Sequence, residues 1–279
     1  MTASSARVPA RRWQVLDGTA LKLLAMALMT ADHIHQMFAP AGAPLWLTIL
    51  GRPVFPLFLF AAAEGFHYTR SRRRYLLRLL LASWGMTLLT TALQQAVPEP
   101  GVVLMNNAFS TFFVTGVYIQ SWDWLTAGLR ARRSGLVRRP GLVLRGLLAA
   151  LLPLAGMLPA LAAGVLSFRE DVPLAVLRGL VFLSLLLPNP LLIEGGPAMA
   201  ALGVLFYIFR KNRAAQVAAL GALTALVWLR RPGDIQCWMA AAALPMLLYN
   251  GRPGRGWKPL FYLYYPAHIA ALYLAAALF

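Results

Sequence analysis

Residues 21–34 read LKLLAMALMTADHI, an apolar run that ends with an aspartate and a histidine. Such a run is typical of a membrane helix, but each ionisable side chain in a bilayer costs about 2.5–3.5 kcal/mol on insertion scales. The whole 279-residue chain has this character, because 59% of its residues are hydrophobic and 13% are charged. A soluble domain carries about 25% charged residues, so the composition excludes an ordinary soluble protein. It also excludes disorder, because there is abundant apolar surface to bury.

Apolar segments recur along the chain and predict an all-α, polytopic transmembrane helix bundle with nine or ten membrane segments. The segments span residues 19–38, 45–68, 75–96, 107–125, 142–168, 172–188, 195–209, 214–229, 235–249 and 259–279. Several of them are shorter than the roughly 20 residues that cross a bilayer without tilt. We expect residues 1–18 to form a short basic cytoplasmic tail, and residues 19–279 to form a single integral membrane domain.

The basic residues predict the orientation of these segments. Lysine and arginine number 26 against 9 aspartates and glutamates, a net charge of +17. The arginines gather in the N-terminal tail and in the loops at residues 70–78 and 130–145, which marks all three as cytoplasmic. Because these cations follow membrane topology, nucleic acid is not an expected partner. The alternation fails before Arg210, so either one segment between 142 and 209 is re-entrant or the segment containing Pro153 and Pro159 is a broken or doubled helix.

All four histidines of the chain lie in or at the edge of an apolar segment. Histidine is the side chain best suited to moving a proton near neutral pH, so this placement indicates a functional site. Carboxylates and an arginine lie in the same segments. The main candidates for this site are Asp32, His33, Arg52, Glu64 and His268.

Helix geometry limits how these candidates can pair. Asp32 and His33 are adjacent, about 100° apart around a helix, so they do not face each other. Asp32 can reach His35 or Gln36 on its own face, or Arg52 across the first loop, and these alternatives stay open. His33 then needs a partner on another helix. A continuous polar path from the cytoplasm to the outer half of the bilayer is a reasonable expectation.

Three stretches of the chain together resemble the TraX family. They are residues 21–34, residues 51–79, which begin GRPVFPLFLF and continue through EGFHYTR and YLLRL, and residues 261–269, FYLYYPAHI. The resemblance covers roughly residues 20–80 and 245–279. It implies a fold like that of the transmembrane acyltransferases, a place in the bacterial inner membrane, and N-acetylation of a pilus subunit with acetyl-CoA as the donor.

With the donor that the resemblance implies, amine acetylation needs a base and donors that hold the oxyanion, and the ionisable residues are candidates for these roles. His33 is expected as the general base or as a transient acyl carrier, with Asp32 beside it. Arg52 and His268 are expected as partners of an oxyanion or a carboxylate, and Glu64 as a group that orients a histidine. Basic side chains at the start of the third apolar segment are expected to hold the phosphates of CoA, because guanidinium matches phosphate geometry. These are Arg70, Arg72, Arg73, Arg74 and Arg78.

We therefore expect an acetyl-CoA-dependent N-acetyltransferase whose partners are membrane lipid, acetyl-CoA and a pilin-like protein, with no metal. One alternative is the same chemistry on an envelope sugar or a small molecule. Another is a proton-coupled transporter, which also needs ionisable groups along a membrane pathway. Inverted repeats would favour the transporter, and the sequence has none that we can detect.

Overall fold

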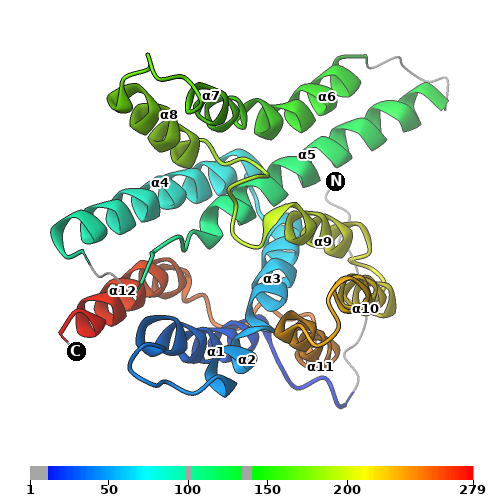
Figure 1. Ribbon diagram of the computed structural model, residues 1–279. Coiled ribbons are helices and arrows are strands. Elements are labelled where there is room, and N and C mark those ends of the chain that lie inside the picture. Colours follow the sequence, from blue (N-terminus) through cyan, green and yellow to red (C-terminus); the bar gives the residue numbers. More distant parts are fainter. Residues whose placement is uncertain (1–11, 99–101, 134–139, 279) are drawn as a thin grey trace. The chain divides into compact units, whose positions relative to one another are not determined.

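The computed structural model describes residues 12–98, 102–133 and 140–278, and these residues are almost entirely helical (Figure 1). Within them the pairing of Leu16 with Tyr249 is the one strand-like feature. The chain divides into two compact units. Of the described residues, the first comprises 12–62, 102 and 209–278, and the second comprises 63–98, 103–133 and 140–208.

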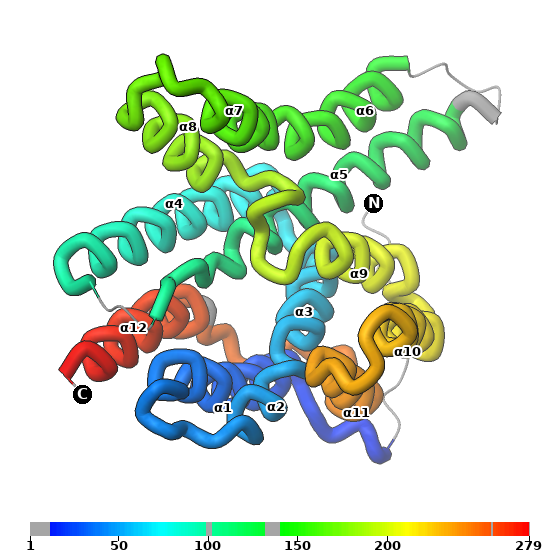
Figure 2. The backbone as a smooth tube through the Cα atoms, in the orientation of Figure 1, coloured from blue at the N-terminus to red at the C-terminus, as the bar shows by residue number. Residues whose placement is uncertain are grey.

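The first unit is built around α1, which packs against α2 and α12 (Figures 1 and 2). Asp17 caps the N-terminus of α1, where its carboxylate accepts from the backbone N–H groups of Thr19 and Ala20. A second group of helices, α10, η1 and α11, packs together within this unit. The elements of the first unit are α1 (Gly18–Phe38), α2 (Trp46–Gly51), the first half of α3 (Val54–Tyr68), α10 (Arg213–Arg230), the 3₁₀ helix η1 (Ile235–Ala242), α11 (Ala243–Leu248) and α12 (Lys258–Ala276).

In the second unit, α5 packs against α4, α6 and α9. Gly146 lets α5 and α6 approach closely, since a Cβ there would lie 2.6 Å from Leu125 Cγ. The helices α7 and α8 pack as a further pair. The elements are the rest of α3, α4 (Arg72–Ala96), α5 (Ala108–Arg133), α6 (Pro140–Ala155), α7 (Leu158–Leu166), α8 (Leu174–Leu186) and α9 (Gly196–Ile208).

Each predicted apolar segment contains helix, but three of them are interrupted. Segment 45–68 breaks at Arg52-Pro53 between α2 and α3, and segment 235–249 changes from 3₁₀ to α-helix at Ala243. Segment 142–168 breaks at Gly156-Met157, between a proline inside α6 and a proline that begins α7. The structure therefore has the broken helix, one of the two alternatives that the charge pattern leaves open.

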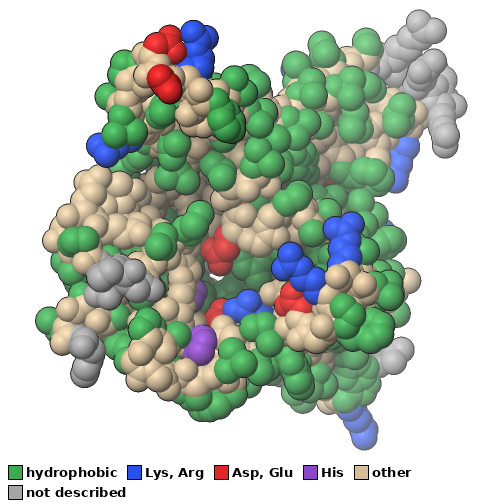
Figure 3. Space-filling model, in the orientation of Figure 1, with side chains coloured by type: hydrophobic (Ala, Val, Ile, Leu, Met, Phe, Trp, Pro, Cys, Tyr) green, Lys and Arg blue, Asp and Glu red, His purple; other side chains and the backbone are tan. Residues whose placement is uncertain are grey.

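Three helical segments are long and apolar enough to cross a membrane: Trp46–Tyr68, Arg72–Ala96 and Pro140–Leu166. Shorter apolar helices span Leu174–Leu186, Gly196–Ile208 and Ile235–Leu248. Hydrophobic side chains are prominent on the face of α6, α7 and α8 seen in Figure 3, and most of the leucines there are exposed. These features are those of a membrane protein. The expected count of nine or ten crossings and the cytoplasmic N-terminus stay predictions.

The segment before α1 is bound to the loop after α11. Leu16 donates its N–H to Leu248 O at 3.0 Å and accepts from Asn250 N at 2.8 Å, and Gly18 N donates to Arg252 O at 2.8 Å. Residues 16–18, the end of the expected tail, are thus part of the fold of the first unit. The earlier part of that tail, through residue 11, lies outside the described residues, as do residues 134–139 of the basic loop.

Candidate functional site

Two buried histidines meet where α1 packs against α12. His33 Nδ1 lies 2.7 Å from His268 Nε2, although 235 residues separate the two in the chain. Their rings are stacked, with centroids 4.9 Å apart and an interplanar angle of 22°. The exposed fraction is 5% for His33 and 9% for His268. The partner that His33 needs on another helix is therefore His268.

The hydrogen bonds around the pair assign a proton to each ring. His268 Nδ1 lies 2.8 Å from the backbone oxygen of Tyr264, and a carbonyl oxygen can only accept, so Nδ1 carries the proton. In neutral His268 the other nitrogen, Nε2, is then an acceptor, and it accepts from His33 Nδ1–H. Neutral His33 consequently carries its lone pair on Nε2. The arrangement makes His33 Nε2 the basic atom of the pair.

Tyr264 supports His268 in a second way, because residues four apart share one face of a helix. Its ring stacks on that of His268 with centroids 4.8 Å apart and an interplanar angle of 13°. The Tyr264 hydroxyl lies 2.6 Å from Thr30 Oγ1, and Thr30 Oγ1 donates to Met26 O at 2.9 Å. Since the proton of Thr30 points to Met26, the tyrosine hydroxyl is the donor to Thr30. One continuous set of bonds thus fixes α12 against α1.

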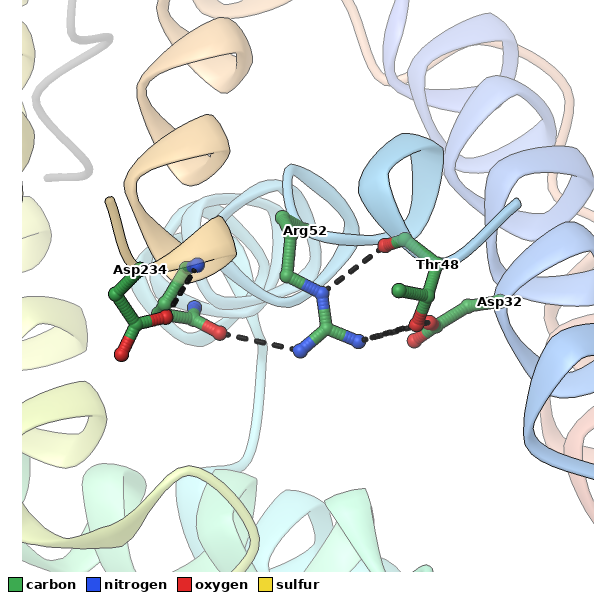
Figure 4. A network of polar contacts seen from close by, with 5 residues as sticks. Asp32, Thr48, Arg52 and Asp234 are labelled. Carbon is green, nitrogen blue, oxygen red and sulfur yellow. Dashed lines mark hydrogen bonds and ion pairs between the residues drawn. The ribbon is translucent and has the colours of Figure 1, made fainter. Parts of the chain in front are cut away.

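A second polar cluster, which we call the Arg52 clamp, meets α1 at Asp32, the residue before His33 (Figure 4). Arg52 Nη2 lies 2.8 Å from Asp32 Oδ1 and 3.1 Å from Thr48 Oγ1, and Arg52 Nε donates to Thr48 O at 3.0 Å. The Thr48 hydroxyl also donates to Asp32 Oδ1. Of the partners open to Asp32 from the sequence, the structure selects Arg52. Gly51 makes room for this ion pair, because a Cβ there would overlap the Asp32 side chain.

The clamp extends to η1 through Gln236. Arg52 Nη1 donates to Gln236 Oε1 at 3.2 Å, the longest hydrogen bond of the clamp. Gln236 in turn donates its backbone N–H to Asp234 Oδ1 at 2.8 Å, which caps η1, and its side-chain nitrogen lies 3.7 Å from Met239 Sδ. The Arg52 guanidinium therefore joins α1, α2 and η1.

The arginines expected to hold CoA phosphates lie in the second unit and fall into two groups. Arg72 forms an ion pair with Asp123 at 2.7 Å and also donates to Tyr207 at 3.0 Å and to Gln120 at 3.2 Å. The Tyr207 hydroxyl donates a hydrogen bond to Asp123 Oδ2 at 2.5 Å. Arg72 is thus engaged within the protein. The others, Arg70, Arg73, Arg74 and Arg78, are exposed.

Glu64 also belongs to the second unit, on the latter half of α3, so its expected role in orienting a histidine stays a prediction. Another carboxylate of this unit, Glu194, accepts from Asn107 N at 2.8 Å, at the start of α5. The Asn107 side chain donates to Ser83 Oγ and Thr87 Oγ1, both at 3.1 Å. We interpret this cluster as the cap of α5, because a carboxylate there complements the helix dipole.

Several site residues were missed from the sequence. Thr48 lies four residues before Arg52, and Tyr264 lies four residues before His268, so helical spacing was a signal for both. Gln236 had no such signal, because its position depends on the packing of η1. The sequence held a weak signal for Asp123, since a carboxylate in a membrane segment needs a cationic partner. Among the described residues no group of three or more His, Cys, Asp or Glu side chains is arranged to hold a metal ion.

These features define a helical protein with membrane-length apolar segments and a buried histidine pair. The family model described as TraX protein matches residues 17–276, so the chain belongs to the TraX family. The family predicted from the three stretches of sequence is therefore confirmed. No curated protein and no solved structure matches the chain. The wider placement among transmembrane acyltransferases stays a prediction.

Proposed function

We propose that this protein is an integral membrane acetyltransferase that moves the acetyl group of cytosolic acetyl-CoA to an amine, with the N-terminus of a pilin-like protein as the acceptor. The buried His33–His268 pair is the observation that carries this proposal, because its hydrogen bonds make His33 Nε2 a proton acceptor. Membership of the TraX family supports the choice of an acetyl donor and a conjugation-related acceptor.

The histidine pair suits the proton transfers that amine acetylation requires. An α-amino group is largely protonated at neutral pH and must lose a proton before it can attack. His33 Nε2 takes that proton and releases it to solvent, and the neutral amine nitrogen then attacks the thioester carbonyl carbon. As the C–N bond forms, His33 Nε2 takes the second proton from the nitrogen. The C–S bond breaks, and the departing CoA thiolate takes this proton from His33. While His33 is cationic, its Nδ1–H donates to His268 Nε2 and the charge is stabilised.

The same proton assignment also serves covalent transfer. In that route His33 Nε2 attacks the thioester carbon itself, the C–S bond breaks, and the Nδ1 proton passes to His268 Nε2. The deprotonated acceptor amine would then take the acetyl group from His33. The proton that the amine nitrogen loses would neutralise the CoA thiolate, and His268 would return its extra proton to His33 Nδ1. A stoichiometric burst of CoA thiol in the absence of any acceptor distinguishes this route from general-base catalysis, which gives no burst.

The exposed arginines of the second unit suit the phosphates of CoA. Arg70, Arg73, Arg74 and Arg78 lie just before or within the first two turns of α4, where guanidinium groups are open to solvent. Guanidinium binds phosphate with two parallel hydrogen bonds. We exclude Arg72 from this set, because Asp123 and Tyr207 already hold its guanidinium.

The test measures release of CoA thiol by the purified protein in detergent. Acetyl-CoA is supplied alone, with a peptide carrying a free pilin-like N-terminus, or with glucosamine. We expect the peptide to be acetylated and His33→Ala to reduce the rate by at least about 100-fold, the usual contribution of a general base. His35→Ala is the matched control, another histidine of α1 outside the pair, and it should keep the wild-type rate.

Three results would contradict parts of this function. A preference for glucosamine would replace the pilin-like acceptor with an envelope sugar. Full activity of His33→Ala would show that His33 is not the base. Release of no thiol with any acceptor, together with proton-driven uptake of a solute into liposomes, would identify a transporter instead.

A further inference from the structure

We infer that Gln236 is a positioning residue whose side-chain carbonyl oxygen occupies, on Arg52 Nη1, the place that the acetyl carbonyl oxygen takes during the reaction. Arg52 would then be the donor that stabilises the oxyanion, and Gln236 would hold that donor in position until the donor substrate displaces it. This inference rests on the proposed acetyl transfer and assigns a new residue to it.

The partners of Arg52 divide into a fixed set and one exchangeable partner. Nε and Nη2 are held by the Asp32 carboxylate and by both oxygen atoms of Thr48, at 2.8–3.1 Å. Those partners belong to α1 and α2, which pack against each other. Nη1 binds a neutral amide oxygen of η1 at 3.2 Å, the long end of the range for such bonds. The fixed set contains the ion pair with Asp32 and only shorter bonds, so the Gln236 contact is the easiest to exchange.

The Gln236 side-chain amide and the acetyl thioester that would displace it present the same kind of oxygen atom to Arg52. The side-chain amide of Gln236 presents a planar carbonyl oxygen, as does a thioester. When the acceptor attacks the thioester carbon, the electron pair of the C=O bond moves to its oxygen, which becomes an oxyanion. An oxyanion is a stronger acceptor for Arg52 than the amide, so the exchange favours the transition state over the ground state.

The element that carries Gln236 is suited to release it. η1 is a 3₁₀ helix of eight residues, whereas runs longer than about four residues are uncommon and often mark hinges. The rise per residue is about 2.0 Å in a 3₁₀ helix and about 1.5 Å in an α-helix, so rewinding η1 would shorten it by roughly 4 Å. With the C-terminal end of η1 held in place, a shift of that size at its N-terminal end would separate Gln236 from Arg52 and leave the Arg52–Asp32 ion pair in place.

The location of the clamp agrees with this role. Asp32, which anchors the fixed side of Arg52, directly precedes His33 on α1. The proposed base and the proposed oxyanion donor are therefore held by neighbouring residues of one helix. Figure 4 shows the Arg52 guanidinium extended between Asp32 and Thr48 at one end and the η1 side at the other.

The test compares two substitutions of Gln236 for which structural and catalytic roles predict different results. Gln236→Glu gives Arg52 a charged partner, so thermal stability in detergent should stay or rise while the rate of acetyl transfer falls at least tenfold. Gln236→Ala removes the placeholder that acetyl-CoA must displace, so stability should fall slightly while kcat/KM for acetyl-CoA rises. Gln120→Glu is the matched control, because Gln120 Oε1 accepts from Arg72 at the same 3.2 Å in the other unit. It should leave kcat unchanged.

The outcomes separate this inference from the proposed function. Two results would overturn this inference while the wild type is active. One is a Gln236→Glu variant with wild-type kcat, and the other is a loss of activity together with stability in both Gln236 variants. Either result would show that Gln236 has a structural role only. If the wild type transfers no acetyl group to any acceptor, the proposed function itself is overturned and the role of Gln236 falls with it.

Discussion

Which ring nitrogen carries the proton in each histidine of the pair depends on one backbone carbonyl oxygen. Tyr264 O fixes the proton on His268 Nδ1, and this in turn determines which nitrogen of His33 is basic. The arrangement resembles the way a buried acceptor orients the histidine of a hydrolase triad, although here the orienting group is a second imidazole. We therefore propose His268 as a positioning residue for His33, and its expected role as an oxyanion partner stays a prediction.

At this scale we predict that the two histidines act as a unit. His268→Ala should reduce the rate of acetyl transfer by about 10²-fold or more, because His33 loses its orienting acceptor. The double variant His33→Ala/His268→Ala should be no slower than His33→Ala alone. Initial rates of thiol release measure both. If the two losses multiply in the double variant, each histidine has an independent role.

The sequence identified the members of the site better than their pairing. Asp32, His33, Arg52 and His268 stand out because ionisable groups are costly in an apolar segment. The partner of Asp32 was one of three alternatives, since helix geometry narrows contacts only within or next to the same helix. The pairing of His33 with His268 spans 235 residues and depends on how α12 packs against α1. No local spacing contains that information.

Among the helices, the contact between α1 and the end of α2 depends on Gly51. Asp32 occupies the space where a side chain at position 51 would begin. Any larger residue must therefore displace Asp32, and with it the ion pair to Arg52. A glycine before Arg52-Pro53 also lies where the predicted segment 45–68 breaks into two helices.

We predict that Gly51→Ala lowers the free energy of unfolding by about 1–3 kcal/mol, the usual cost of overpacking, and also lowers the rate of acetyl transfer. Gly85→Ala is the control. It lies inside α4 with open space around its Cβ position, so it should be neutral or stabilising by up to about 1 kcal/mol. Thermal unfolding in detergent compares the two. Equal stability of both variants would contradict the assigned role of Gly51.

The arginines at the start of α4 give a second prediction for an element. Arg72→Gln should lower the free energy of unfolding by about 1–3 kcal/mol, because Asp123 loses its ion-pair partner. Arg73→Gln should keep that stability and raise the KM for acetyl-CoA. Unfolding curves and steady-state kinetics measure the two effects. An Arg72→Gln variant with normal stability and a raised KM for acetyl-CoA would show that Arg72 belongs to the proposed phosphate-binding set.

The helices themselves were predicted well, and their interruptions less so. Each of the ten apolar segments contains helix, because a long apolar run in a bilayer must satisfy its own backbone hydrogen bonds. The break at Gly156-Met157 was one of two alternatives, since prolines signal a break without fixing its place. The 3₁₀ winding of Ile235–Ala242 was not predicted, because hydropathy does not distinguish 3₁₀ from α winding.

For the molecule as a whole, the charge pattern predicts which loops face the cytoplasm. We expect the loop between α3 and α4 to be cytoplasmic and the loop between α1 and α2 to be external. The chain has one cysteine, Cys237, so a Cys237→Ser background allows single-site labelling. With an impermeant maleimide on spheroplasts, Ala41→Cys should be labelled directly, and Ser71→Cys only after the membrane is permeabilised. The reverse pattern would invert the predicted orientation.

The distance along the chain between His33 and His268 has a consequence for biosynthesis. α1 is made early, but the partner of its histidine is made only when residues 258–276 leave the ribosome. Under the proposed function, we therefore expect that a nascent or prematurely terminated polypeptide does not consume acetyl-CoA. We also expect that translation is nearly finished before turnover begins, and that a peptide of residues 250–279, supplied in trans to a shortened chain, restores turnover.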